Sequence, residues 1–132
     1  MKRWIQSRLS GGPPPKIEIG RLGEDLAAKE LRRRGYRIRE RNFRCSLGEI
    51  DIVAEDGEEI VIVEVKTRSA GAHADPQDSV TLAKAARLIQ LGRAYLARHE
   101  LDAADWRIDV VAVRTDRAGG ATVEIIRDAV SE

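Results

Sequence analysis

LGEIDIVAEDGEEIVIVEVKTRS, residues 47 to 69, holds two β-branched runs on either side of Asp56 and Gly57. Such runs around an Asp-Gly turn predict an antiparallel hairpin, with strands over residues 49–55 and 58–67. Carboxylates and one lysine interrupt the apolar positions of both strands. Because buried charges are costly without a partner, these interruptions make the hairpin the first place to look for a functional site.

The acidic residues of the hairpin can share one face. Successive side chains alternate across a strand, so Glu64 and Lys66 point to the same side. With a two-residue turn at residues 56–57, Glu49 lies opposite Glu64, and Asp51 falls on the same face. Diagonal neighbours lie about 7–8 Å apart, so the Asp51 and Glu64 carboxylates can reach one cation, unless a bulge rotates Asp51 to the other face.

A third carboxylate comes from the helix-forming segment upstream, from Ile17 to about Arg34, which Gly35 is placed to end. Apolar and small residues follow Glu24 at i+3, i+4 and i+7, and if this face packs on the sheet, Glu24 points inward. Clustered acids in a partly buried site need a metal or a basic partner. The three residues that follow Glu24 on this face are Ala27, Ala28 and Leu31.

Oxygen ligands without thiolate or imidazole favour Mg²⁺ or Mn²⁺, so we expect one of these ions at Asp51, Glu64 and Glu24. Lys66 can position an attacking water or help to deprotonate it, or stabilise charge that develops on a phosphate. The alternative is that Glu64 and Lys66 form a solvent-facing ion pair, worth less than ~1 kcal/mol.

The net charge is only +1, but it is unevenly distributed. Residues 32–44 contain seven arginines and one acid, whereas residues 49–66 contain seven acids and one lysine. This pairing suits a site that attracts a polyanion with arginines and holds a cation with carboxylates. A solvated strand face would also be rich in arginine, so both interpretations stay open. The candidates for phosphate contact here are Arg37, Arg39, Arg41 and Arg44.

Composition excludes several classes of protein. The single cysteine, Cys45, and two histidines provide no cluster with zinc-binding spacing. There is no apolar run near the ~20 residues of a membrane span and no apolar stretch typical of a secretory signal, so we expect a cytoplasmic protein that does not enter the membrane. Glycines and prolines predict a flexible arm over residues 1–16, before a single domain over residues 17–132.

The strand over residues 36–44 extends the hairpin to a three-stranded antiparallel meander. Its two aromatic residues, Tyr36 and Phe43, could stack on bases, but aromatic residues make up only 4% of the chain and we expect both in the core. Residues 69–80 predict a loop, and Thr81 can cap the helix that follows.

That helix, from Leu82 to about His99, is expected to pack one stripe of apolar and small residues on the sheet. Strands follow over residues 106–114 and 122–127. Asp109 interrupts the first of these, either as an acid that supports the site or as a purely structural partner of Arg107. The stripe expected on the helix consists of Leu82, Ala85, Ala86, Ile89, Gly92 and Leu96.

The complete order of predicted elements, α-β-β-β-α-β-β, describes a mixed sheet.

A composite of short motifs carries a family resemblance over residues 17–114. The chain resembles the bacterial YraN family and, more distantly, archaeal Holliday-junction resolvases and the restriction-endonuclease-like PD-(D/E)XK nuclease superfamily. The resemblance implies an α/β fold with a mixed central sheet flanked by helices. The motifs are, in order, Gly20-x-x-Gly23-Glu24, Gly35-Tyr36, Arg41-Asn42, Gly48-Glu49-Ile50-Asp51 and Glu64-Val65-Lys66-Thr67-Arg68.

The resemblance also implies a function, namely a metal-dependent endonuclease that hydrolyses phosphodiester bonds of DNA, which can be structured or branched. It implies a substrate-facing helix carrying Lys84 and Arg87, and a homodimer as a possible assembly. The alternative is a non-catalytic nucleic-acid-binding or scaffold protein that retains the nuclease fold. The implied catalytic set is Glu24, Asp51, Glu64 and Lys66.

Overall fold

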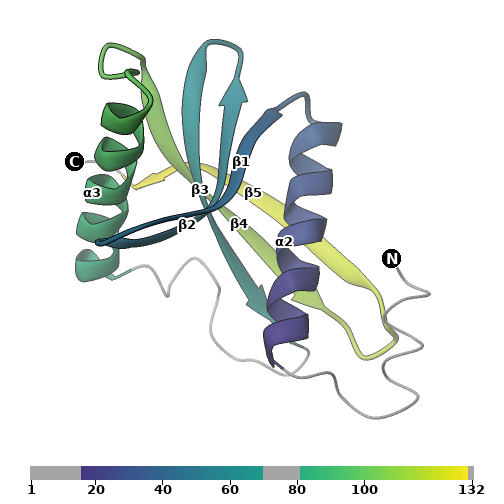
Figure 1. Cartoon of the computed structure of the whole chain (residues 1–132). Coiled ribbons are helices and arrows are strands. Elements are labelled where there is room, and N and C mark those ends of the chain that lie inside the picture. The colour runs from purple at the N-terminus through teal and green to yellow at the C-terminus, as the bar shows by residue number, and fades with distance from the viewer. Residues whose placement is uncertain (1–15, 70–80, 131–132) are drawn as a thin grey trace.

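Five strands form one mixed sheet that lies between two helices in a computed structural model, which describes residues 16–69 and 81–130 (Figure 1). The strands lie in chain order across the sheet. The predicted α/β class and the order α-β-β-β-α-β-β are confirmed. The elements are α2 (Lys16–Arg33), β1 (Arg37–Cys45), β2 (Gly48–Asp56), β3 (Glu59–Arg68), α3 (Leu82–Arg98), β4 (Trp106–Thr115) and β5 (Ala121–Val130).

The direction of the strands follows from the connections. β1, β2 and β3 form the predicted antiparallel meander. β3 and β4 are parallel, and α3 lies in the crossover that a parallel pair requires. β5 returns antiparallel to β4. The predicted arm, apart from Lys16, and residues 70–80 of the predicted loop lie outside the described residues. Among the described helices, none is long and apolar enough to cross a membrane.

Each helix covers its own face of the sheet and has its own core. Tyr36 and Phe43 are both buried, as predicted, but in different cores. The α2 core consists of Leu22, Leu26, Ala27, Ala28, Leu31, Tyr36, Ile52, Ala54, Val61, Val63, Val111 and Val113. The α3 core consists of Phe43, Ile50, Val53, Ile60, Ile62, Leu88, Leu91, Tyr95, Leu96, Ile108 and Val130.

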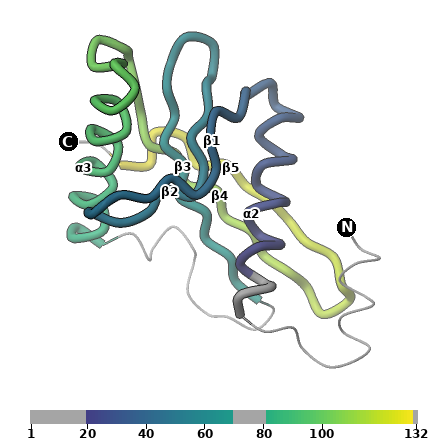
Figure 2. Tube along the Cα trace, viewed as in Figure 1, coloured from purple at the N-terminus to yellow at the C-terminus, as the bar shows by residue number. Residues whose placement is uncertain are grey.

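The β1–β2 hairpin reaches across the sheet to α3 (Figure 2). A Cβ on Gly48, at the end of this hairpin, would lie 3.7 Å from Leu91 of α3. Ile52 belongs to the α2 core, yet Ile50, two residues earlier, belongs to the α3 core. Residues two apart on a regular strand share a face, so the hairpin must coil sharply at the residue between them, Asp51.

The predicted turn of the second hairpin is wrong by one residue. Asp56 pairs with Glu59, so the turn is formed by Gly57 and Glu58. Gly57 has φ 63°, which suits the first central position of a two-residue hairpin turn. The pairing is therefore displaced by two residues from the expected register. A displacement of two keeps every side chain on its expected face, because the strand period is two.

The predicted stripe on α3 is also partly wrong. Leu82 is 91% exposed and Ala86 is exposed, whereas Gly92 and Leu96 are buried as expected. The indole ring of Trp106 lies against Gly92 and leaves no room for a Cβ there, so this contact fixes the rotation of the helix. The first turn of α3 lies outside the core. The buried residues of α3 are Leu88, Leu91, Gly92, Tyr95 and Leu96.

Asp109 is a structural partner of Arg107, which was one of the two predictions for this residue. Its carboxylate is 0% exposed and accepts hydrogen bonds from Arg107 Nε at 2.9 Å and from the Tyr36 hydroxyl at 3.1 Å. Arg107 also pairs with Asp56 at 2.8 Å and with Glu59. The network ties β4 to the turn end of the β2–β3 hairpin.

Helix α2 lies very close to β3 at Gly23. A Cβ on Gly23 would collide with the hydroxyl of Thr67, whereas a Cβ on Gly20, one turn earlier, would meet no atom within 4 Å. The missing side chain of Gly23 therefore lets the helix approach the strand that carries Glu64 and Lys66.

We expect Gly23→Ala to destabilise the fold and Gly20→Ala to leave it unchanged or slightly more stable. Overpacking costs about 1–3 kcal/mol, which for a chain of this size lowers the melting temperature by roughly 5–10 °C. Alanine at an open helix position has a higher helix propensity than glycine. Thermal unfolding measures both variants, and equal melting temperatures would show that α2 can move away from Thr67 at no cost.

Candidate active site

The candidate site lies where β2 separates from β3. Backbone pairing between these strands ends at Ile52 and Val63. At the next residue, Asp51, the carboxylate Oδ2 accepts a hydrogen bond of 2.8 Å from the backbone N–H of Val65. The side chain thus satisfies a strand donor that a longer ladder would pair with backbone. Asp51 is thereby fixed in the opening between the two strands.

Glu64 and Lys66 lie on β3 beside this opening. One further step of the Ile52–Val63 register sets Glu64 opposite Asp51. Lys66 Nζ lies 3.7 Å from Glu64 Oε1, and the two side chains are 12% and 24% exposed, respectively. The structure therefore brings Asp51, Glu64 and Lys66 together at one half-buried edge, which we call the acidic edge.

The surroundings of Asp51 in the acidic edge perturb the pKa of its carboxyl group. The pKa of Asp51 is raised to about 7, and burial is the largest cause of this shift. The charges of Glu64, Glu24 and Glu49 raise this pKa further, while the Val65 N–H lowers it. Several carboxylates this close resist simultaneous ionisation, and a bound cation relieves their repulsion.

Glu24 reaches the acidic edge from α2. The residues in line with it, Ala27, Ala28 and Leu31, are buried, so the predicted inward face of the helix is confirmed. Burial raises the pKa of Glu24, and the nearby Arg41 guanidinium partly opposes that shift. The helix therefore delivers a third, partly desolvated carboxylate to the site.

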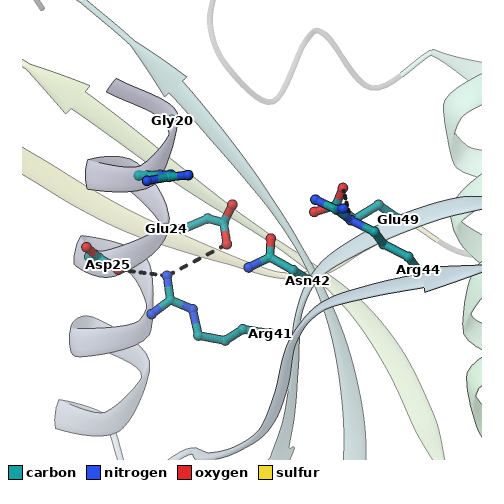
Figure 3. Close-up of a pocket in the computed structure, with 8 residues that line it drawn as sticks. Gly20, Glu24, Asp25, Arg41, Asn42, Arg44 and Glu49 are labelled. Atoms are coloured by element: carbon teal, nitrogen blue, oxygen red, sulfur yellow. Dashed lines mark hydrogen bonds and ion pairs between the residues drawn. The ribbon is translucent and has the colours of Figure 1, made fainter. Parts of the chain in front are cut away.

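An open pocket of about 730 Å³ adjoins the acidic edge, between α2 and the strands β1 and β2 (Figure 3). Arginines and acids occur in equal number in its lining, and Glu24 belongs both to the pocket and to the acidic group around Asp51. The lining residues are Gly20, Arg21, Glu24, Asp25, Arg41, Asn42, Arg44 and Glu49.

The arginines of β1 do not share one face. Arg39 points toward α3, where its Nε donates to the Tyr95 hydroxyl at 3.0 Å, and a register shift between Ile38 and Glu40 turns Arg41 to the other face, opposite Ile52. Arg39 also pairs with Glu55 at 2.9 Å. Arg39 is therefore held by residues of its own chain, away from the pocket.

Arg41 and Arg44 instead border the pocket. Arg41 Nη2 lies 2.7 Å from Asp25 and 3.7 Å from Glu24, so Asp25 is its closer partner (Figure 3). Arg44 is 77% exposed and pairs with Glu49 at 3.3 Å. Arg37, at the start of β1, is exposed.

Cationic residues of α3 approach the acidic edge from its other side. The contact of Lys84 with the Lys66 side chain and the charge of Lys66 lower the pKa of Lys84. Thr81 caps the helix as predicted, and its side chain accepts from the Lys84 backbone N–H. Arg87 passes near Gly48 at the end of the β1–β2 hairpin. The start of α3 therefore places two exposed cations beside Lys66 and this hairpin.

The donor chemistry of the acidic edge fits a hard divalent cation. Within residues 16–69 and 81–130, no three acids, cysteines or histidines are already arranged around a common metal position. Mg²⁺ commonly takes only one or two protein carboxylates and keeps several waters. Asp51 and Glu64 can supply these two carboxylates, with Glu24 nearby to hold the water shell.

Two groups of the site, the Asn42 side chain and the Val65 N–H, have no role predicted from the sequence. Asn42 lies between Glu24 and Glu49 (Figure 3), and the Val65 N–H fixes Asp51. The sequence did contain a signal at Asn42, because asparagine is rare inside strands and common at positive φ. No sequence pattern indicates which backbone N–H a carboxylate will accept from.

Comparison with known proteins gives the family. The profile of the uncharacterised protein family UPF0102 matches residues 23–113. The chain belongs to this family. UPF0102 is the YraN family that the motifs resembled.

Individual UPF0102 relatives align over most of their own length. A UPF0102 protein of Beutenbergia cavernae is 50% identical over 112 residues, which cover 85% of this chain and 95% of the relative. One of Arthrobacter sp. (strain FB24) is 52% identical over 109 residues, 83% of this chain and 92% of the relative. One of Moorella thermoacetica is 51% identical over 111 residues, again 83% and 92%. The segment matched by the UPF0102 profile includes every residue of the acidic edge.

Proposed function

We propose that the protein is a metal-dependent endonuclease that hydrolyses phosphodiester bonds of DNA, including structured or branched DNA. The observation that best supports this is the convergence of Asp51, Glu64 and Lys66 where β2 separates from β3. Bound Mg²⁺ or Mn²⁺ would polarise the phosphate and favour ionisation of a water. Membership of the family does not by itself carry this function.

Glu24 and the three residues of the acidic edge each have a proposed role. Asp51 and Glu64 hold the cation, and Glu24 holds the cation or its water shell. The Lys66 ammonium is tethered by Glu64, at 3.7 Å, within the same edge. From there it orients the attacking water and so helps its deprotonation, or it stabilises charge that develops on the phosphate.

The DNA backbone would cross the acidic edge between two cationic borders. Arg41 and Arg44 lie on the side of the pocket, and Lys84 and Arg87 lie on the side of α3. Phosphate contacts from such residues position a strand without reading its sequence. Two further arginines, the exposed Arg37 and the α3-facing Arg39, are weaker candidates for the same role. A homodimer, in which two sites serve a branched substrate, and a cytoplasmic location belong to the same proposal.

We expect the double substitution of Arg41 and Arg44 by alanine to weaken DNA binding and to reduce its salt dependence. Each phosphate contact contributes about 0.7–0.9 to the slope of log affinity against log salt, so the slope should fall by roughly 1–2. Titrations of a DNA junction at several salt concentrations measure this slope. Arg32→Ala, an exposed arginine at the far end of α2, is the matched control. Equal slopes for all three proteins would assign the pocket arginines to solvation.

A non-catalytic nucleic-acid-binding or scaffold protein is the second candidate. Ion pairs within the chain favour it, because Glu64 pairs with Lys66, and Arg41 pairs with Asp25. Such pairs can stabilise the fold of a protein that has no catalytic activity. In that case DNA would bind but would not be cut.

Cleavage assays with Mg²⁺ and Mn²⁺, on branched, single-stranded and duplex DNA and on RNA, test the proposal. We expect the wild-type protein to cut a DNA substrate, and Lys66→Ala to lose about 10²–10⁴-fold in rate, the usual contribution of a proton-transfer residue. Wild-type protein that binds DNA and never cuts it would favour the scaffold. Equal cutting by wild type and Lys66→Ala would remove Lys66 from the mechanism.

A further inference from the structure

Asn42 has an unusual backbone conformation at the centre of the site. Its φ is 57°, in the left-handed region, although it lies within strand β1. Its neighbours Arg41 and Phe43 pair with Ile52 and Ile50 of β2, so Asn42 is the residue of β1 opposite Asp51. Asparagine adopts this conformation more readily than most other residues.

The position of Asn42 coincides with the sharp coil of the β1–β2 hairpin. On β2, Ile52 faces α2 and Ile50 faces α3, so the strand changes face at Asp51. The left-handed residue on β1 stands directly across from that change. The backbone of Asn42 therefore accommodates the same coil that turns Asp51 into the opening beside β3.

The side chain of Asn42 lies between two carboxylates from different elements, Glu24 of α2 and Glu49 of β2 (Figure 3). With its amide nitrogen toward the acids, it donates to Glu24 Oε1 at 3.1 Å and to Glu49 Oε1 at 2.8 Å. For Glu24 this contact is shorter than the 3.7 Å to Arg41, whose closer partner is Asp25. The amide is thus the nearest polar contact described for the Glu24 carboxylate.

We propose that Asn42 is a positioning residue, whose amide holds Glu24 of α2 and Glu49 of β2 at fixed places beside Asp51. A neutral amide with two N–H donors can satisfy both carboxylates without compensating their charge. The amide therefore leaves the charge of Glu24 and Glu49 to a divalent cation and to the neighbouring guanidinium groups of Arg41 and Arg44. This inference rests on the proposed function for its ligand, Mg²⁺ or Mn²⁺, and adds the residue that orders the site around it.

Asn42→Gly separates the side chain from the backbone, because glycine keeps the left-handed conformation and lacks the amide. Asn42 is exposed, so the cores remain intact. We expect an unchanged melting temperature and Mn²⁺ affinity about 10–100-fold weaker by calorimetric titration, the usual effect of losing a contact that orients a metal ligand. Glu100→Gly is the matched control, because Glu100 also has φ 57° but follows α3. Equal Mn²⁺ affinity for wild type and Asn42→Gly overturns the inference.

Two further measurements separate this inference from the proposed function. If Asn42 acts through Glu24, its substitution should have no added effect on Mn²⁺ affinity in a Glu24→Gln background; additive effects oppose the inference. In the metal-free protein, the carboxyl ¹³C resonances of Glu24 and Glu49 should both shift in Asn42→Gly and not in the control. Wild type that binds no Mn²⁺ would refute the metal site alone, whereas unshifted resonances would refute the role of Asn42 whatever the metal does.

Discussion

Asp51→Asn and Glu64→Gln are each expected to abolish the stabilisation of the fold by Mg²⁺ or Mn²⁺. A ligand that binds only the native state at about 100 times its dissociation constant adds roughly 2.7 kcal/mol to the free energy of unfolding. For a chain of this size that is a rise of roughly 10 °C in melting temperature. Each substitution removes one anionic oxygen donor and nearly keeps its shape. Thermal unfolding with and without saturating Mn²⁺ measures the rise.

Two controls define what this loss means. Lys66→Ala should keep the full response to metal, because its proposed role concerns water and phosphate. Glu58→Gln removes an exposed carboxylate from the turn of the same hairpin and should also respond as wild type does. A rise that survives in both Asp51→Asn and Glu64→Gln would mean that the ion binds elsewhere on the protein.

The sequence was most informative where a local pattern is compatible with only one local structure. The face of α2 that carries Glu24 follows from helical periodicity, and it is buried as predicted up to Leu31. Gly35, with φ 93°, ends that helix region, and Thr81 caps α3. These features depend on residues within two helical turns of each other, so neighbouring elements do not alter them.

Features set by contacts between elements could not be predicted in the same way. The rotation of α3 depends on Trp106 packing against Gly92, and these residues are far apart in the chain. The separation of Arg39 from Arg41 depends on a register shift in β1, which strict alternation does not allow for. Strict alternation therefore predicts one basic surface for the arginine-rich strand, although Arg39 faces α3 and Arg41 faces α2.

The acidic edge combines both kinds of feature. Strand alternation correctly placed Glu64 and Lys66 on one side, and the error of two residues in register preserved that face. The coil at Asp51, which turns the carboxylate toward the Val65 N–H, has no counterpart in alternation. Periodicity could therefore select the right residues for the site without giving its geometry.

Without metal, ionised Asp51 is expected to destabilise the fold, so that stability falls as pH rises. The pKa of Asp51 is raised from 3.8 to about 7, mainly by burial and then by Glu64. A carboxyl group with a higher pKa in the folded than in the unfolded protein binds more protons when folded. Its contribution to stability is therefore neutral below about pH 4 and becomes increasingly unfavourable up to about pH 7.

Asp51→Asn should remove this pH dependence, because the amide stays neutral throughout. In a chelating buffer, the variant should gain roughly 2–4 kcal/mol over wild type between about pH 4 and pH 8, measured by urea unfolding at each pH. The difference between the two proteins cancels the titration of groups that Asp51 does not touch. Saturating Mn²⁺ should reverse the trend for wild type, because a metal ligand must be deprotonated and binding releases its proton. If the difference between variant and wild type is the same at every pH, Asp51 is not titrating in this range, and the repulsion that a cation would relieve is absent.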